Sequence, residues 1–193
     1  MIKILAIYGS HRRGHNSDML LDLMLKGMER EDIEIKRIYI SGLNIKPCLA
    51  CSHCYKDGKC IIKDDMKSIY QDFEEADIVI TATPIYFNTV SSHIKILIDR
   101  CQSIWAGKYI LRQSPISRKK RLGYVICVGG APEPNEGLEC VMKVLSMFYK
   151  CINVEMVGNK FAADTDKIAV VDRIDLCSDI SIEGEKLLKK YYE

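Results

Sequence analysis

Four cysteines within residues 48–60 form the most specific chemical pattern in this chain. They follow the spacing C-x2-C-x2-C-x5-C and are Cys48, Cys51, Cys54 and Cys60. Compact thiolate arrays suit a cubane [4Fe–4S] cluster, which needs four soft ligands that converge from one loop. Zinc also accepts four thiolates but usually takes them from two separated pairs, and unmetallated thiols are a third interpretation. The spacing favours the [4Fe–4S] cluster, and we interpret His53 as a loop residue near it rather than as a ligand.

A second pattern lies between the first apolar segment and the first helical segment. Residues 9–17 read Gly-Ser-His-Arg-Arg-Gly-His-Asn-Ser. A strand that ends in a glycine turn and leads into a helix presents free backbone N–H groups and the positive end of the helix dipole to an anion. The candidate side-chain donors are Ser10, Ser17, Asn16, and Arg12 or Arg13. This set suits a terminal phosphate monoester, and its spacing matches neither the dinucleotide-binding glycine motif nor the NTPase P-loop.

Two further segments follow later strands and are expected at the same edge of the sheet. The first contains Thr83, Pro84, Ile85, Tyr86, Phe87 and Asn88, and the second contains Gly129, Gly130 and Ala131. The carboxyl ends of parallel strands meet at one edge, where doubly wound sheets bind their ligands. Aromatic side chains and closely approaching glycine backbone suit a flat heteroaromatic ring. Residues 83–88, Gly129 and Gly130 are therefore candidate cofactor-binding residues.

Apolar runs alternate with helical periodicity along the chain, which predicts a doubly wound α/β fold. We expect strands at residues 2–8, 33–40, 77–83, 121–128 and 152–157, and helices at residues 17–29, 64–75, 91–105, 136–149 and 183–192. Residues 2–8 are apolar apart from Lys3, as in a central parallel strand. Residues 33–40 alternate isoleucine with charge, as in an outer strand. The predicted sheet is therefore parallel and five-stranded, in the flavodoxin-like order 2-1-3-4-5.

The chain is expected to form one domain over residues 1–193, because its length and 48% apolar content suffice for one core. Residues 41–63 form a cysteine-rich loop inserted after the second strand. A loop longer than about 12–15 residues is usually functional or disordered, so we expect this one to be functional. We also expect a C-terminal extension over residues 159–193 that ends in the final helix, and the minimal fold does not account for residues 161–180.

Bulk composition argues against several classes of partner. The formal net charge is +2, so no electrostatic argument favours nucleic acid or an anionic membrane. No apolar run approaches the roughly 20 residues that cross a bilayer, and the N-terminal segment lacks a signal cleavage site. We therefore expect a cytoplasmic protein, in which disulfides are rare. The scattered cysteines are interpreted as small buried apolar residues: Cys101, Cys127, Cys140, Cys151 and Cys177.

The edge segments resemble the NADPH-dependent FMN reductase group of flavodoxin-like proteins over roughly residues 1–158. The resemblance rests on Gly-Ser-x-Arg-x-x-x-Asn-Ser at residues 9–17, Thr-Pro-Ile-Tyr-Phe at residues 83–87 and Ile-Lys-Ile-Leu-Ile-Asp-Arg at residues 94–100. It implies that Ser10, Arg12, Asn16 and Ser17 hold the FMN phosphate, that residues 84–88 contact the ribityl chain and isoalloxazine, and that Gly129 and Gly130 close over the ring. His11 stands where many relatives have proline, and Ser17 where threonine is common.

The cysteine array extends the resemblance to the iron–sulfur flavoproteins of archaea and anaerobic bacteria. In that family the compact cysteine motif ligates one [4Fe–4S] cluster, and FMN sits close to it. The resemblance therefore implies FMN together with a cluster on Cys48, Cys51, Cys54 and Cys60. It also implies a homodimer or homotetramer, because such relatives build the flavin pocket at a subunit interface. The expected partner is NAD(P)H or a small redox protein.

These patterns predict an FMN- and [4Fe–4S]-containing electron-transfer oxidoreductase. The cofactors supply the chemistry in such a protein, so we assign no catalytic acid or base. Two alternatives stay open. One is a cluster-free NAD(P)H-dependent FMN or quinone reductase whose cysteine loop is structural or binds zinc. The other is a flavin-free module whose thiols sense the redox state.

Overall fold

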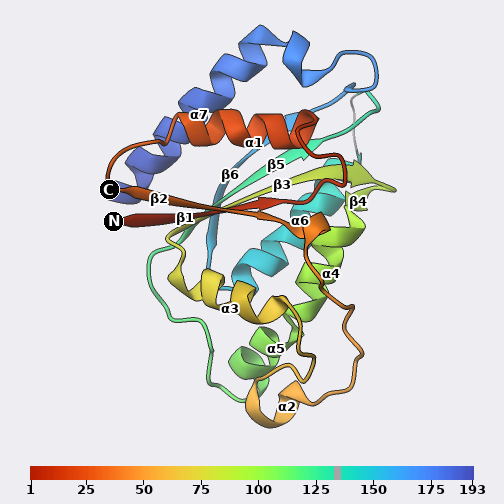
Figure 1. The fold of residues 1–193 in the computed structure, drawn as a ribbon, viewed down its shortest axis with the longest axis vertical. Helices are drawn as coiled ribbons and strands as arrows, with labels where there is room; N and C mark the ends of the chain where they lie inside the picture. Colours follow the sequence, from red (N-terminus) through yellow and green to blue (C-terminus); the bar gives the residue numbers. More distant parts are fainter. Residues whose placement is uncertain (133–135) are drawn as a thin grey trace.

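The fold is built on a parallel β-sheet, shown in a computed structural model that describes residues 1–132 and 136–193. The strand order is β2-β1-β3-β5-β6 (Figure 1). These strands are β1 (Ile2–Tyr8), β2 (Ile33–Tyr39), β3 (Ile78–Tyr86), β5 (Leu122–Val128) and β6 (Glu155–Ala162). A short strand, β4 (Thr89–Val90), pairs antiparallel with the end of β3. Counted along the chain without β4, the order is 2-1-3-4-5, so the predicted flavodoxin-like topology is confirmed.

The burial of each strand agrees with its place in the sheet. β5 is buried along its whole length, and β1 is buried except at Lys3. β2 has exposed charged residues between partly buried isoleucines, because it lies at the edge. In-register parallel pairing runs from Ile2 opposite Ile33 to Tyr8 opposite Tyr39. The apolar run therefore belongs to a central strand and the alternating run to an outer strand, as predicted.

Helices cover both faces of the sheet (Figure 1). One layer consists of α1 (Asn16–Lys26) and α7 (Ile174–Tyr192); the other consists of α3 (Met66–Glu75), α4 (Ser92–Arg100) and α6 (Glu136–Cys151). Alternate side chains of β1 enter each layer, since successive residues of a strand point to opposite faces. Ile4 and Ala6 belong to the core beneath α1 and α7. Leu5 and Ile7 belong to the core beneath α3, α4 and α6.

Several element boundaries differ from the predicted ones. β3 continues to Tyr86 instead of ending at Thr83. The helix expected over residues 91–105 is divided into α4 and α5 (Gln102–Trp105), and a π-helical turn, η2 (Ala106–Ile110), follows. α7 begins at Ile174 rather than at residue 183. The last strand starts at Glu155 rather than at residue 152, because Asn153 has a φ of 57° and forms the left-handed turn that follows α6.

The two segments outside the minimal fold have distinct structures. The cysteine-rich loop includes the short helices η1 (Ile40–Gly42) and α2 (Cys54–Asp57). Residues 161–180 comprise the end of β6, a connection, the 3-10 helix η3 (Val170–Asp172) and the start of α7. In the described part of the chain, no helix is both long and apolar enough to cross a bilayer.

Candidate flavin and cysteine-cluster sites

The loop between β1 and α1 is anchored to the neighbouring strand and helix. The Gly9 N–H donates to the carbonyl of Ala82 over 2.8 Å. The Ser91 hydroxyl donates to the Gly9 carbonyl over 2.6 Å, and the same hydroxyl accepts from the Ile94 N–H as the N-cap of α4. A Cβ on Gly9 would lie 2.3 Å from the Ile94 side chain. Glycine is therefore required here, and Ser91 is a positioning residue that sequence reasoning missed.

Of the two candidate arginines, Arg12 remains available to an anion. Its guanidinium donates to Nδ1 of His15 over 3.0 Å and is exposed at the mouth of the loop. Its backbone N–H donates to the Ser10 hydroxyl over 3.0 Å. The Arg13 guanidinium instead lies over the ring of Tyr39, 4.8 Å from the ring centre. The structure thus distinguishes Arg12 from Arg13, which the sequence left as equivalent candidate donors.

Asn16 and Ser17 have partners inside the protein. The side-chain carbonyl of Asn16 accepts the Val170 N–H over 3.1 Å, which leaves its Nδ2 group to donate to an anion. The Ser17 hydroxyl is buried and lies 3.4 Å from the Asp18 carboxylate, which also accepts the Gly14 N–H. Burial raises the pKa of Asp18. Ser17 therefore serves the packing of α1, and we omit it from the proposed phosphate ligands.

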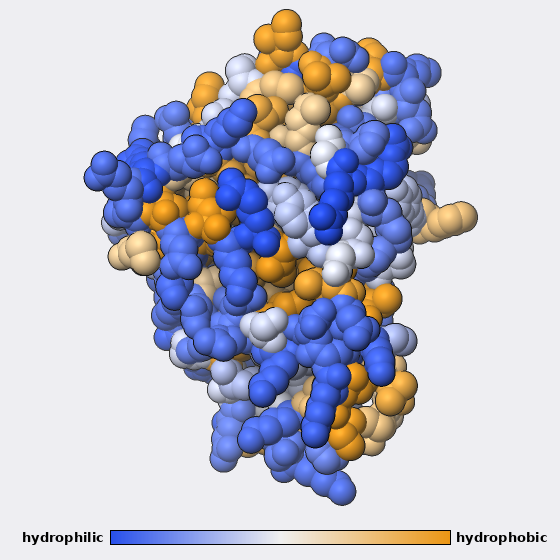
Figure 2. All heavy atoms as spheres, in the orientation of Figure 1, coloured by the Kyte–Doolittle hydropathy of each residue, from blue (hydrophilic) through white to orange (hydrophobic). Residues whose placement is uncertain are grey.

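The segment expected to contact a flat ring is a β-hairpin rather than a loop. Phe87 and Asn88 connect β3 to β4 with φ angles of 48° and 56°. Two successive left-handed residues define the hairpin turn that usually contains glycine or asparagine, so Phe87 is held in an unfavourable backbone conformation. Its side chain is fully exposed, and a hydrophobic side chain projects from this hairpin in Figure 2.

Thr83 and Pro84 lie deeper than predicted. The Thr83 hydroxyl is buried, donates to the Pro84 carbonyl over 2.9 Å and accepts the Ser91 N–H over 3.1 Å. Pro84 is buried and pairs with Val128 of β5. The Thr83 hydroxyl thus holds the start of α4 against β3, and contact of Thr83 with the cofactor stays a prediction.

The glycine segment after β5 is lined by residues 164–166, which explains part of the unassigned stretch 161–180. The N–H groups of Asp164 and Thr165 donate to the carbonyls of Ala131 and Gly129 over 2.8 and 3.0 Å. A Cβ on Gly130 would lie 2.3 Å from the Asp166 carboxylate. A larger residue at position 130 would therefore require the exposed Asp166 side chain to turn away. The connection after β6 thus fixes the backbone that the sequence predicted to approach a ring.

The hairpin and the glycine segment meet around one cavity of about 410 Å³. Its walls come from Ile85, Phe87, Asn88, Gly129, Gly130, Ala131, Pro132 and Glu136. This volume is within the range of small-molecule and cofactor sites. The structure therefore brings together the two segments that sequence analysis placed at one edge. We call this space the flavin cavity.

All four clustered cysteines line a second, open cavity of about 460 Å³, here called the cysteine cavity. Cys48 and Cys51 are exposed, whereas Cys54 and Cys60 are half-buried. Ala50 and Ser52, which flank Cys51, have φ angles of 51° and 57°. Non-glycine residues in this region are strained, and such strain clusters at functional sites. The loop is thus bent sharply on both sides of Cys51.

The thiols interact with one another without surrounding a single ion. Burial raises the pKa of the Cys54 thiol, and Cys48, Cys60 and Cys51 add to the rise. Within residues 1–132 and 136–193, no three His, Cys, Asp or Glu side chains are placed to hold one metal ion. In a cubane cluster each cysteine binds a different iron, so its ligands lie farther apart than those of zinc. The four thiol donors line one cavity, and such a donor set suits a thiolate-bound metal centre.

A buried ion pair closes the base of the cysteine loop. Arg100, the last residue of α4, donates to both carboxylate oxygens of Asp64 over 2.5 and 3.1 Å and to the Lys46 carbonyl over 2.8 Å. The Lys46 N–H donates to the same carboxylate over 2.9 Å. Burial opposes the charge on Arg100, but the hydrogen bond to Asp64 together with the nearby Cys60, Tyr70 and Asp64 outweighs it and raises the pKa of the guanidinium. Arg100 thereby joins the residues before Cys48 to those after Cys60, a role that sequence analysis missed.

Two of the scattered cysteines belong to the cysteine cavity. Cys101 and Cys151 line it, and the Cys151 thiol lies 3.8 Å from the Cys101 carbonyl. Both are buried, as is Cys127. Cys140 is exposed and Cys177 half-buried. The expectation of burial is therefore wrong for Cys140, which lies on the outer face of α6.

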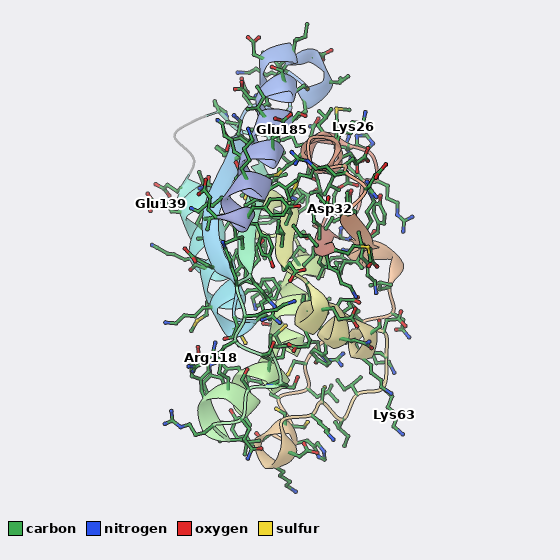
Figure 3. All side chains as sticks on the ribbon, turned by 90° about the vertical axis from the view of Figure 1, so that its left-hand side faces the viewer. Lys26, Asp32, Lys63, Arg118, Glu139 and Glu185 are labelled. Carbon is green, nitrogen blue, oxygen red and sulfur yellow. The ribbon has the colours of Figure 1, made fainter. Side chains whose placement is uncertain are left out.

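The two cavities lie at opposite ends of the same helices. α4 starts at the loop anchor Ser91 and ends at Arg100 beside the cysteine cavity, a span of roughly 13 Å at 1.5 Å per residue. α6 likewise extends from Glu136 in the flavin cavity to Cys151 in the cysteine cavity. In Figure 3, Lys63, just after the cysteine array, lies far below Glu139 of α6. The length of α6 thus separates the two cavities, and the adjacency of cluster and FMN that the resemblance implies stays a prediction.

Comparison with known proteins identifies the family. The model of the NADPH-dependent FMN reductase family matches residues 2–167. The chain belongs to this family. Membership makes it a flavin-dependent oxidoreductase and removes the flavin-free alternative.

Its relatives in the FMN reductase family include several described as iron–sulfur flavoproteins. One from Archaeoglobus fulgidus is 33% identical over 162 residues, which cover 83% of this chain and 78% of that protein. One from Methanocaldococcus jannaschii is 29% identical over 158 residues, 82% of this chain and 77% of that protein. Among solved structures, an FMN-dependent NADH-azoreductase from Bacillus anthracis, in complex with FMN, has a TM-score of 0.73 at 15% identity and covers 97% of this chain and 99% of that one. This last likeness supports the fold.

Proposed function

We propose that this FMN reductase family member is an electron-transfer flavoprotein that binds FMN and one [4Fe–4S] cluster. The observation that carries the proposal is the cysteine cavity, which all four thiols of the C-x2-C-x2-C-x5-C array line. When bound, FMN converts between two-electron and one-electron transfer and the cluster passes single electrons. The chain's own residues bind, orient and shield these groups.

The FMN phosphate is proposed to bind at residues 9–16. Ser10, Arg12 and the Nδ2 group of Asn16 supply side-chain donors, and the start of α1 supplies backbone N–H groups. Ser91 holds the loop in place through the Gly9 carbonyl. The isoalloxazine is proposed to occupy the flavin cavity, between the hairpin residues 85–88 and the backbone of Gly129 and Gly130. Pro84 supports the hairpin from below.

The cluster is proposed to bind to Cys48, Cys51, Cys54 and Cys60. The apolar wall formed by Ile98, Trp105 and Phe148 would keep water from its inner side. Arg100 lines the same cavity, and Cys60 contributes to the raised pKa of Arg100.

We also propose a homodimer or homotetramer. The hairpin beside the flavin cavity exposes Tyr86 and Phe87 to solvent, and exposed aromatic groups beside a cavity are typical of an interface. A second copy that covers this hairpin would shield the flavin. NAD(P)H is the proposed electron donor and a small redox protein the proposed acceptor. Light scattering of the purified chain, alone and as Phe87→Ser, would measure the assembly.

An anaerobic assay tests the proposal that FMN accepts the electron pair and the cluster passes single electrons onward. NADPH is added to the purified protein, and bleaching of the flavin and reduction of a one-electron acceptor are followed together. Cys51→Ser should bleach as the wild type does but reduce the acceptor slowly. Cys140→Ser is the matched control, because Cys140 is exposed and outside both cavities. Equal rates for Cys51→Ser and wild type would contradict the proposal.

A further inference from the structure

Two histidines, His11 and His93, meet beside the proposed phosphate loop. Their Nδ1 atoms lie 3.0 Å apart, and their ring centres lie 3.8 Å apart. His11 follows Ser10 in the loop, and His93 lies in the first turn of α4, next to the N-cap Ser91 that holds Gly9. His11 is exposed and His93 is half-buried. The pair therefore joins the two elements that converge on the anion site.

The contact between the rings restricts their charge. At 3.0 Å one Nδ1 donates a proton and the other accepts it, so at least one imidazole is neutral. Burial lowers the pKa of His93, and the nearby His11 lowers it further. Without an anion nearby, the pair thus resists the additional proton that would convert one ring to an imidazolium. A phosphate dianion beside the pair reverses this preference, because opposite charge favours the protonated form.

The same loop and helices carry other charged or titratable groups, which have contacts of their own. They are Arg12, Arg13 and His15 of the loop, Asp18 of α1 and Lys95 of α4. Arg12 contacts His15 and Arg13 covers Tyr39. Asp18 accepts the Gly14 N–H, and Lys95 binds Asp99 over 2.7 Å. Among the described residues, His11 is the one titratable neighbour that lowers the pKa of His93, in addition to burial.

We propose that His11 and His93 belong to the phosphate site and make the chain prefer FMN to riboflavin by taking up a proton when the phosphate monoester binds. The proton comes from solvent, and no covalent bond of FMN changes. The protonated pair then offers the phosphate a charge-assisted hydrogen bond. This inference rests on the proposed function, in which FMN places its phosphate at residues 9–16.

Flavin affinity as a function of pH tests the inference. The full-length chain, depleted of flavin, is titrated with FMN and with riboflavin at pH 6.5 and pH 8.5 by flavin fluorescence. The wild type should bind FMN about tenfold more tightly at pH 6.5, because one unit of pKa change corresponds to a factor of ten. Riboflavin should bind equally at both values. His11→Asn and His93→Asn should each remove the pH dependence for FMN, and the double variant should add nothing.

A matched control distinguishes an effect of the histidine pair from the effect of any positive charge on α4. Lys95→Gln removes a positive charge from the same helix and should keep the pH dependence. Far-UV circular dichroism checks that each variant is folded. The inference is overturned if His93→Asn keeps the wild-type dependence, or if riboflavin shows the same dependence as FMN. A wild type that binds no FMN at either pH overturns the proposed function as well.

Discussion

The guanidinium of Arg100 binds both carboxylate oxygens of Asp64 at the base of the cysteine loop, and both side chains are withdrawn from solvent, with 1% and 0% exposed. Tyr70 extends the arrangement by donating to the Arg100 carbonyl over 2.7 Å. The Nε of Arg100 is buried without a partner among the described residues. The pair therefore fixes the loop ends while one donor is left unused.

Removal of Arg100 should destabilise the fold and the cluster together. Arg100→Met leaves Asp64 as an uncompensated buried charge, which typically costs about 3–5 kcal/mol. We expect a lower urea midpoint and less iron per chain after anaerobic purification. Lys95→Ala is the control, because the exposed Lys95–Asp99 pair on the same helix is worth at most about 0.5 kcal/mol. If Arg100→Met had the same urea midpoint and iron content as this control, the Arg100–Asp64 pair would have no role in stabilising the fold or the cluster.

Acid should weaken the ion pair between Arg100 and Asp64. Burial alone would raise the pKa of Asp64, but hydrogen bonds from Arg100, Lys46 and Met66 outweigh it and hold the pKa below its usual value. A lowered pKa contributes stability above the unfolded value of about 3.9, and this stability is lost as the pH falls through the folded pKa. The free energy by which the wild type exceeds Asp64→Asn should therefore shrink below about pH 4. Urea unfolding from pH 6 to pH 3 measures it, and a constant difference would contradict this assignment.

Arg12 and Arg13 should differ in their effect on flavin binding. Arg12→Ala removes the exposed guanidinium at the loop, and we expect FMN affinity to fall on the order of tenfold, as for a charge-assisted hydrogen bond. Riboflavin affinity should be unchanged, since riboflavin has no phosphate. Arg13→Ala loses its contact with Tyr39 and should leave the ratio of FMN to riboflavin affinity as in the wild type. The opposite ranking would place the phosphate elsewhere.

Thiol accessibility should separate the scattered cysteines. Burial raises the pKa of Cys127 to about 12 and that of Cys151 to about 11, so neither forms the reactive thiolate near neutral pH. Iodoacetamide at pH 8 should modify the exposed Cys140 in the folded protein and leave Cys127 and Cys151 untouched. Peptide mass spectrometry identifies the modified sites. Rapid modification of Cys127 would show that its strand opens readily.

Sequence periodicity predicted the sheet well because the order of apolar and polar residues in each strand reflects which of its faces are buried. The apolar run of β1 and the alternation of β2 assigned both strands to their correct places. The last strand was misplaced because Ile152 and Val154 are buried in the turn after α6. The actual strand includes Gly158, Asn159 and Lys160, which have low strand propensity. Pairing with β5 overrides that propensity.

The site residues that sequence reasoning missed act through distant parts of the chain. Arg100 meets Asp64 across 36 positions, and Ser91 meets Gly9 across 82. Both separations are much longer than the repeat of a helix or a strand, so no local motif predicts either contact. Cys101 and Cys151 also join the cysteine cavity only because α4 and α6 end side by side. Local motifs therefore predicted the candidate cofactor-binding groups, and tertiary structure was needed for the groups that position them.

Metal and flavin analysis of anaerobically purified protein tests the central claim most directly. Iron, zinc and acid-labile sulfide are measured per chain, together with a visible spectrum and the extracted flavin. The account predicts about four irons and four sulfides per chain, as in a [4Fe–4S] cluster, with FMN and no zinc. Flavin without iron, or with one zinc per chain, would contradict it and identify the chain as a simple flavin reductase with a structural cysteine loop.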